Sequence, residues 1–307
     1  MNRSGPLVSV IIPTIGRAEL ARAVESVRRQ RVPVEIIVVA DIAEDAPAAT
    51  VVRDAAMGCD LIFTGGGKRG ARARNLGVAR AASDWVAFLD DDDEWAPEKL
   101  EVQLAAALEH GATVLSCRVN QRSSETSLVV THAVPVALLQ PDEDPADYLF
   151  RRRRPGAGRA SVFTSTMLVR RSLADEVPWE PSLRRHQDWD WLLRLSHHPS
   201  YTFHHCPEAM VDIQVGSSNS ISAGGDWRSS LDWANSALAE KAPNTYVDFV
   251  VAQPLRYALQ ARSLEGVNQA LRAAIRRRRF PAGGPALIAA SGVFGRRAIE
   301  RGMARIR

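Results

Sequence analysis

Residues 85–95 of the chain read Trp-Val-Ala-Phe-Leu-Asp-Asp-Asp-Asp-Glu-Trp. The apolar start of this segment is typical of a buried strand, and the aspartates that follow indicate its carboxyl end. Adjacent carboxylates repel one another, so a fold seldom places four of them together unless a cation or hydrogen-bond donors offset the repulsion. Oxygen ligands suit Mg²⁺ or Mn²⁺, and Mg²⁺ is usually held by one or two carboxylates together with substrate phosphates. The alternative interpretation is a solvated acidic turn that caps the following helix.

Other apolar segments precede this one, and a helical pattern separates each from the next. Strands are expected over residues 8–12, 35–40, 61–64 and 85–89, and helices over residues 18–29, 48–57 and 71–82. This alternation predicts a doubly wound α/β fold, with a mostly parallel sheet and helices on both faces. Ligands of such sheets bind beyond the carboxyl ends of the strands. We therefore expect residues 13–17, Asp41 and residues 90–93 to converge on one site.

The chain after this region has a less regular pattern. A helix is expected from Pro97 to Gly111, with strands over residues 113–119 and 161–169. Beyond about residue 226 the pattern is helical, apart from a turn at residues 280–285. We therefore expect one α/β domain over residues 1–225 and a basic helical extension over residues 226–307.

Composition restricts the class of protein. The chain has 307 residues, of which 46% are apolar and 24% charged, as in an ordinary globular protein. Cys59, Cys117 and Cys206 lack the paired spacing of a disulfide framework or a zinc site. No apolar run reaches the ~20 residues of a membrane-spanning helix, and the first residues do not resemble a signal peptide. We expect a cytoplasmic protein.

The formal charge of +4 is unevenly distributed. Residues 251–307 hold 12 arginines against two glutamates and carry +10, which leaves −6 for residues 1–250. The arginine runs lack the interleaved aromatic residues of a nucleic-acid site, so no nucleic-acid partner is expected. Apolar residues at partial helical spacing among these arginines are typical of a segment that lies on an anionic membrane surface. A solvated helical cap or an oligomer contact explains the same pattern equally well.

Several motifs occur in the order and spacing of one family. They are Val-Ser-Val-Ile-Ile-Pro-Thr at residues 8–14 followed by Arg17, Ala-Arg-Asn-Leu-Gly at residues 73–77, and the segment from Phe88 to Leu100. Together these motifs resemble the family 2 glycosyltransferases of GT-A fold, over roughly residues 7–215. The resemblance implies a metal-dependent, inverting transfer of a sugar from a UDP- or dTDP-linked donor. The acceptor would be a hydroxyl on a glycan, a lipid-linked saccharide or a small metabolite.

The resemblance also implies a set of residues that bind the donor nucleotide. Pro13, Thr14 and Arg17 would line the nucleotide pocket, and Asp41 would meet the base. The family usually has an acidic pair at this last position, whereas Ala40 precedes Asp41 in this chain. Capping of the next helix is the alternative role for Asp41.

The diphosphate would be bound by the second and third motifs. Arg74 would lie at the start of a helix whose amides and arginines face the anionic groups of the donor. The acidic run corresponds to the DxD element, in which Asp90 reaches the ribose or the metal and Asp92 binds the metal that bridges the diphosphate. Asp91 is expected in the same site. A bound Mg²⁺ or Mn²⁺ would neutralise the leaving nucleoside diphosphate.

The general base is expected in a second acidic cluster. Residues 186–190 resemble the ED motif of the family, with Gln187 in place of the glutamate and Asp188 as the aspartate. Asp188 would accept the proton of the acceptor hydroxyl, or it would only cap the helix that follows. Asp190 is the second candidate for the base. Trp189 and Trp191 would form a stacking platform for the acceptor or belong to the core.

A function of another class is also compatible with these residues. A catalytically silent GT-A domain that acts as a binding or scaffold protein would tolerate the departures at Ala40 and Gln187. Intact Asp92 and Asp188 favour the enzyme.

Overall fold

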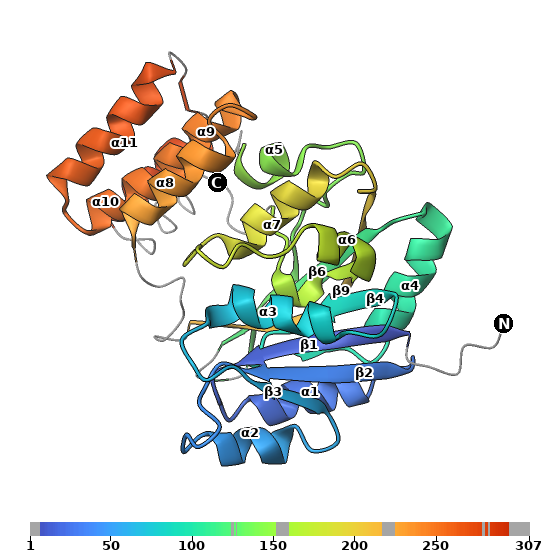
Figure 1. Ribbon diagram of the computed structural model, residues 1–307. Coiled ribbons are helices and arrows are strands. Elements are labelled where there is room, and N and C mark those ends of the chain that lie inside the picture. The colour runs from blue at the N-terminus through green and yellow to red at the C-terminus, as the bar shows by residue number, and fades with distance from the viewer. Residues whose placement is uncertain are drawn as a thin grey trace. The chain divides into compact units, whose positions relative to one another are not determined.

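The computed structural model describes residues 7–123, 126, 128–151, 160–216, 225–277, 280–281 and 283–294 (Figure 1). The chain forms two compact units. The first unit comprises Met1–Asp142, Ser161–Leu183 and Gln187–Ser217, and the second comprises Glu143–Ala160, Arg184–His186 and Ser218–Arg307. The expected domain boundary between residues 225 and 226 stays a prediction.

The first unit is built on one sheet with the strand order β3-β2-β1-β4-β8-β6-β9-β5, and β7 pairs with β6. The strands are β1 Val8–Thr14, β2 Val34–Ala40, β3 Asp60–Phe63, β4 Trp85–Phe88, β5 Glu94–Trp95, β6 Val114–Ser123, β7 Val129–Val134, β8 Leu168–Arg170 and β9 Phe203–Val215. Strands β3, β2, β1 and β4 are parallel, whereas β8 runs antiparallel to β4 and to β6. The predicted α/β fold is confirmed, with a parallel half followed by a mixed half.

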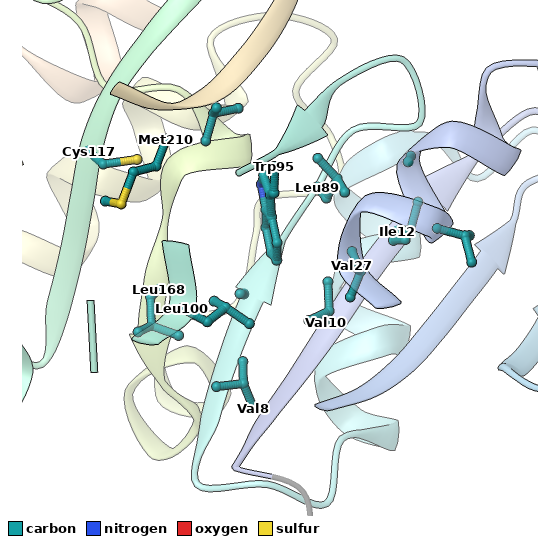
Figure 2. Close-up of a cluster of buried hydrophobic side chains, with 14 of the residues drawn as sticks. Val8, Val10, Ile12, Val27, Leu89, Trp95, Leu100, Cys117, Leu168 and Met210 are labelled. Atoms are coloured by element: carbon teal, nitrogen blue, oxygen red, sulfur yellow. The ribbon is translucent and has the colours of Figure 1, made fainter. Parts of the chain in front are cut away.

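Helices cover both faces of the parallel half, as predicted. They are α1 Leu20–Arg28, α2 Ala49–Ala55 and α3 Arg69–Arg80. Figure 1 shows α1 and α2 on one side of the sheet and α3 on the other. Alternate side chains of β1 point to opposite faces. Val10 packs in the same cluster as Val27 of α1, as Figure 2 shows, while Ile11 faces α3.

The contact between β1 and α3 depends on Gly77. A Cβ at this position would lie 2.4 Å from Cγ2 of Ile11, so a larger residue would displace the helix from the strand. This close approach brings α3 directly onto β1. It explains why the motif at residues 73–77 ends in glycine.

The helix expected after Pro97 is α4, Lys99–His110. Gly111 ends it with a φ of 63°, a left-handed conformation that glycine adopts without strain. Trp95 and Leu100 pack with Leu89 in the main core cluster (Figure 2).

The strand expected over residues 161–169 is wrong in its first part. Residues Thr164–Thr166 form a short 3₁₀ helix, and the strand β8 begins only at Leu168. The hydroxyls explain the difference, because Thr166 Oγ1 donates to the carbonyl of Phe163 and Ser165 Oγ bonds outside its own segment. Side-chain hydrogen bonds of this kind compete with a strand ladder. Two more helices complete the first unit, α6 Arg171–Glu176 and α7 Gln187–Ser196.

The second unit is helical. Its elements are α5 Pro145–Phe150, α8 Trp227–Ala237, α9 Pro243–Val250, a π-helical turn Val251–Leu255, α10 Arg256–Gln260, α11 Leu264–Arg276 and α12 Gly283–Phe294. Phe150, Trp233 and Phe249 form its aromatic centre, with ring centroids 4.9–5.9 Å apart. The turn expected at residues 280–285 is shorter, since α12 begins at Gly283. In the described part of the chain no helix has both the length and the apolar character needed to cross a membrane.

Candidate functional site

Thr14 and Arg17 contact the acidic run from the end of β1 and the loop after it. Thr14 Oγ1 donates to Asp91 Oδ2 at 2.6 Å. Arg17 Nη1 donates to Asp91 Oδ1 at 3.1 Å and to Asp92 Oδ2 at 2.9 Å. Pro13, which is partly buried, precedes Thr14 in β1. The parallel pairing of β1 with β4 therefore brings two of the motifs together, as predicted from the strand ends.

The four aspartates divide into two kinds by their exposure. The side chains of Asp90 and Asp92 are 39% and 32% exposed. The side chain of Asp91 is only 6% exposed, and Asp93 is 7% exposed. Asp90 and Asp92 can therefore reach a ligand, whereas Asp91 and Asp93 serve contacts inside the protein.

Burial changes the protonation behaviour of this run. It raises the pKa of Asp91 to about 6, although Thr14 and Arg17 act in the opposite direction. Burial, and then the charge of Asp90, raise the pKa of Asp92. Burial and Asp90 also raise the pKa of Asp93 well above its ordinary value. The negative charges of the run are thus only partly offset by the protein.

Asp93 connects the acidic run by hydrogen bonds to Ser165 and Gln214. Its carboxylate accepts a hydrogen bond from Ser165 Oγ at 2.6 Å and one from the backbone amide of Gln214 at 3.1 Å. Ser165 Oγ in turn accepts from the backbone amide of Asp90 at 3.1 Å. The indole of Trp95 donates to the carbonyl of Ser165 at 2.7 Å. Ser165 therefore fixes both ends of the run.

Arg74 links the acidic run to α7. Its Nη2 donates to Asp90 Oδ1 at 2.6 Å, and its Nη1 donates to Gln187 Oε1 at 3.3 Å. Its guanidinium lies over the ring of Trp179, 4.9 Å from the centroid. The arginine is 8% exposed, and among the described residues its Nε has no hydrogen-bond partner. A buried cation with a spare donor is suited to an anionic ligand.

Asp188 lies at the start of α7 and is electrostatically coupled to the same site. Burial raises its pKa to about 6, and Asp90 acts in the same direction. A backbone hydrogen bond from Trp189 and the charge of Arg74 act in the opposite direction. Because α7 begins at Gln187, Asp188 lies within the first turn of the helix and not at its N-cap. A pKa of about 6 is suited to a general base.

The other side chains of this cluster have different surroundings. Asp190 Oδ2 accepts from Arg194 Nε at 2.7 Å within α7. Trp191 is fully buried, stacked on Trp179 with centroids 4.1 Å apart, and its edge meets Phe88. Trp191 is therefore a core residue, and a platform role for it is wrong.

Asp41 holds the loop before α3. Its carboxylate accepts hydrogen bonds from the Thr64 hydroxyl and from the backbone amides of Lys68 and Arg69, the latter two at 2.8 and 2.6 Å. Burial alone would raise the pKa of Asp41, but these hydrogen bonds hold it below its ordinary value. The glycines at residues 65–67 all have positive φ, which lets the chain turn back onto the carboxylate. The helix that follows Asp41 in the chain is α2, whereas the carboxylate of Asp41 contacts the amides at the start of α3.

The acidic run suits a divalent cation in its donor chemistry. Asp90 and Asp92 present accessible carboxylate oxygens, and burial, followed by the charge of Asp90, raises the pKa of Asp92. Across the described ranges, no group of three or more His, Cys, Asp or Glu side chains is arranged to hold a metal. Two carboxylates are typical of an ion that takes its other ligands from a diphosphate and water.

Sequence reasoning missed Ser165 and Trp179. Ser165 is separated from the acidic run by about seventy residues, and nothing in its neighbourhood marks it as a partner of Asp93. The side chain of Asn75 forms two hydrogen bonds with the backbone of Trp179. Asn75 Nδ2 donates to the carbonyl of Trp179, and the backbone amide of Trp179 donates to Asn75 Oδ1, both at 2.8 Å. The asparagine beside Arg74 in the second motif was the available signal for a long-range contact.

Comparison with known proteins finds a match to one family. The family described as glycosyl transferase family 2 matches residues 9–177. The amylovoran biosynthesis glycosyltransferase AmsB of Erwinia amylovora is 27% identical over 272 residues, covering 84% of this chain and 86% of its own. The putative colanic acid biosynthesis glycosyl transferase WcaA of Escherichia coli K12 is 27% identical over 200 residues, covering 63% of this chain and 67% of its own.

Solved structures share the fold of this chain. Residues 1–349 of TarS from S. aureus, in complex with UDP-GlcNAc, superpose with a TM-score of 0.56 at 15% identity, over 94% of this chain and 92% of that one. The mannosyltransferase PcManGT from Pyrobaculum calidifontis, in complex with GDP-Man and Mn²⁺, superposes with a TM-score of 0.52 at 14% identity, over 99% and 80%. At these identities the likeness concerns the fold alone, which is of GT-A type.

Proposed function

Because this chain belongs to glycosyl transferase family 2, we propose that it transfers a sugar from a nucleoside-diphosphate sugar to an acceptor hydroxyl with inversion at the anomeric carbon. Membership of the family makes the chain a glycosyltransferase; the donor, the metal, the stereochemistry and the acceptor belong to the proposal. The observation that carries it is the pair of accessible carboxylates, Asp90 and Asp92, each bonded to an arginine from a different element. The two carboxylates are suited to bind a cation, and the two arginines beside them are suited to bind a diphosphate.

The donor nucleotide is proposed to lie at the carboxyl ends of β1 and β2. Pro13, Thr14 and Arg17 would line its pocket, and Thr14 and Arg17 are already oriented there by Asp91. Asp41 is proposed at the base end, where its hydrogen bonds hold the loop before α3 in shape. A UDP- or dTDP-linked donor is proposed, and the complexes of neighbours with UDP-GlcNAc and GDP-Man support a nucleotide sugar in general.

The diphosphate is proposed to replace the internal partners of the two arginines. The Nε of Arg74 has no hydrogen-bond partner among the described residues, and Arg17 and Asp92 form an ion pair whose side chains are 30% and 32% exposed. Asp90 and Asp92 would then be available for Mg²⁺ or Mn²⁺, and a bound cation supplies neutralisation of the leaving nucleoside diphosphate. The complex of the mannosyltransferase with Mn²⁺ supports the use of a divalent ion.

Asp188 is proposed as the general base. Its pKa of about 6 leaves it ionised at neutral pH and close enough to that pH to accept a proton efficiently. The acceptor oxygen forms the new bond to the anomeric carbon, and its proton passes to the Asp188 carboxylate. The bond from that carbon to the diphosphate oxygen breaks, and the nucleoside diphosphate leaves with the electron pair. Attack opposite the leaving group inverts the anomeric carbon.

The acceptor is proposed to be a hydroxyl on a growing polysaccharide or its lipid-linked precursor. The relatives named for amylovoran and colanic acid biosynthesis support this over a small metabolite. A cytoplasmic location with peripheral contact to the inner membrane face, through the basic C-terminal helices, agrees with such an acceptor. No nucleic-acid partner is proposed.

A catalytically silent donor-binding domain is the second candidate. Gln187 favours it slightly, because an amide stands where the family has an acid and accepts from Arg74. The raised pKa of Asp188 favours the enzyme. A silent domain would bind a donor with metal and leave it intact, whereas the enzyme hydrolyses it slowly in the absence of acceptor.

A thermal-shift and hydrolysis screen tests the proposal. UDP-, dTDP- and GDP-sugars are each added to the full chain with and without Mn²⁺. A donor at about 100 times its Kd adds about 2.7 kcal/mol to the apparent stability, and we expect this gain to need Mn²⁺. Asp92→Asn should abolish the metal-dependent part, while Asp54→Asn, an exposed acid on α2, should not.

The proposal fails if no nucleotide sugar shifts the melting temperature or is hydrolysed. It also fails if Asp92→Asn behaves as the unchanged protein does.

A further inference from the structure

Helix α11 of the second unit, labelled in Figure 1, carries large apolar side chains that are exposed. Leu264 is 82% exposed, Ile275 70% and Leu271 40%. Phe280, which follows the helix, is 99% exposed. Two leucines, an isoleucine and a phenylalanine this exposed and this close in sequence are unusual on a free surface.

These side chains lie along one face of the helix. Leu264, Leu271 and Ile275 are related by seven and eleven residues, which is the spacing of a single stripe at 3.6 residues per turn. The helix packs onto its own unit with other positions, because Gly266, Ala270 and Ala274 are its buried residues. The exposed stripe is therefore additional to the face that stabilises the fold.

Arginines border the stripe. Arg272 and Arg276 each follow a stripe residue by one position, which sets them about 100° around the helix from it. Both are exposed, and within the described residues neither forms an ion pair. Glu265, the acidic residue of α11, is paired with Arg228. The charge presented beside the stripe is thus positive.

This combination indicates the chemistry of the partner. The chain segment 295–307 carries five arginines against Glu300, so charge repulsion opposes its binding to this face. The same face of a second copy would place arginine against arginine. An apolar stripe bordered by arginines, with an exposed phenylalanine a few residues after it in the sequence, matches the boundary between anionic lipid headgroups and acyl chains.

We propose that the face of α11 formed by Leu264, Leu271, Ile275, Arg272 and Arg276, together with Phe280, docks on the surface of an anionic phospholipid bilayer. The helix lies in the plane of the surface, with the stripe below the headgroups and the arginines among the phosphates. The inference deepens the membrane contact proposed above by naming the surface that makes it. It does not depend on the glycosyl-transfer chemistry.

Flotation of the full chain with vesicles tests the docking face. Vesicles of phosphatidylcholine mixed with phosphatidylglycerol are compared with vesicles of phosphatidylcholine alone, at low and at high salt. We expect recovery with the anionic vesicles only, and less of it at high salt. The double variant Arg272→Gln/Arg276→Gln should weaken partition by about tenfold or more, because each arginine near the surface adds about a factor of five.

A second variant separates the apolar from the charged contribution. Leu271→Ser/Ile275→Ser keeps every arginine and should also weaken partition by about tenfold, through lost insertion. The matched controls are Arg29→Gln and Leu108→Ser, an exposed arginine and an 84% exposed leucine of the first unit. Both controls should float as the unchanged protein does. Circular dichroism and melting temperature confirm that all variants are folded.

The proposal is overturned if the unchanged protein stays with neither kind of vesicle, or if both α11 variants float as well as the controls. It is also overturned if the variants convert a dimer into a monomer, measured by light scattering, without a change in flotation. Hydrolysis of the donor in solution should be equal in all these proteins. A failure in flotation therefore leaves the proposed enzyme standing, and an inactive protein that floats leaves the docking face standing.

Discussion

The acidic run Asp90–Asp93 and the exposed arginines of helix α11 are each a group of like charges, but the two groups are balanced in different ways. Every aspartate of the run has a partner inside the first unit, from Arg17 and Arg74 to the hydroxyls of Thr14 and Ser165. The exposed arginines of α11 have no acidic partner among the described residues.

A preorganised site can be recognised by charged side chains whose partners come from several elements of the same unit. Partners from β1, α3 and the 3₁₀ helix converge on the acidic run, so its geometry is set before a ligand arrives. The arginines of α11 are set only by their helix, and their partner must come from outside. Removing a charge should therefore affect catalysis and stability in the first case, and surface association alone in the second.

The largest effect is expected from Asp188→Asn, which removes the proposed general base, a group whose pKa is affected by the charges of Arg74 and Asp90. We expect kcat to fall about 10²–10⁴-fold. The thermal shift with donor and Mn²⁺ should be kept, because the amide retains the shape of the carboxylate. Asp190→Asn is the control and should change kcat little, since that residue is paired with Arg194. Equal losses in both variants would refute the assignment.

The pH dependence of kcat provides a second test of Asp188 as the general base. Burial raises the pKa of Asp188 to about 6, and the base acts only when it is ionised. The rate should therefore be constant above this pH and fall about tenfold for each pH unit below it. Burial also brings the pKa of Asp91 to about 6, so the profile of Asp91→Asn shows which group is responsible. An inflection that disappears in Asp91→Asn would contradict our assignment to Asp188.

The smallest effects are expected on the free energy of unfolding, in one variant near the acidic run and one variant on α11. Ser165→Ala deprives the buried Asp93 carboxylate of a hydrogen bond and should lower the free energy of unfolding by about 1–3 kcal/mol. Arg272→Gln on α11 should change it by no more than about 0.5 kcal/mol. Denaturant unfolding of both variants measures the contrast. Equal values would mean that the partners of the acidic run do not stabilise it.

Local patterns predicted the parallel half of the sheet well. The apolar segments at residues 8–12 and 85–89 correspond to β1 and β4, because a strand buried on both faces needs a continuous apolar run. Gly111 was correctly expected to end a helix, since the left-handed conformation there depends on a single residue. Residues 161–169 were harder, because their hydroxyls bond to groups that are far away in sequence.

The sequence by itself determined the α/β alternation, the family, and the gathering of residues 13–17, Asp41 and residues 90–93 at the strand ends. Hydrophobic periodicity and motif spacing are local properties that need no knowledge of tertiary contacts. Only the tertiary structure decided which aspartates are accessible, that Arg74 joins Asp90 to Gln187, and that one face of α11 is left uncovered. Exposure, pKa and hydrogen bonding depend on neighbours brought together from distant parts of the chain. The physical role of each charge therefore follows from packing rather than from its place in a motif.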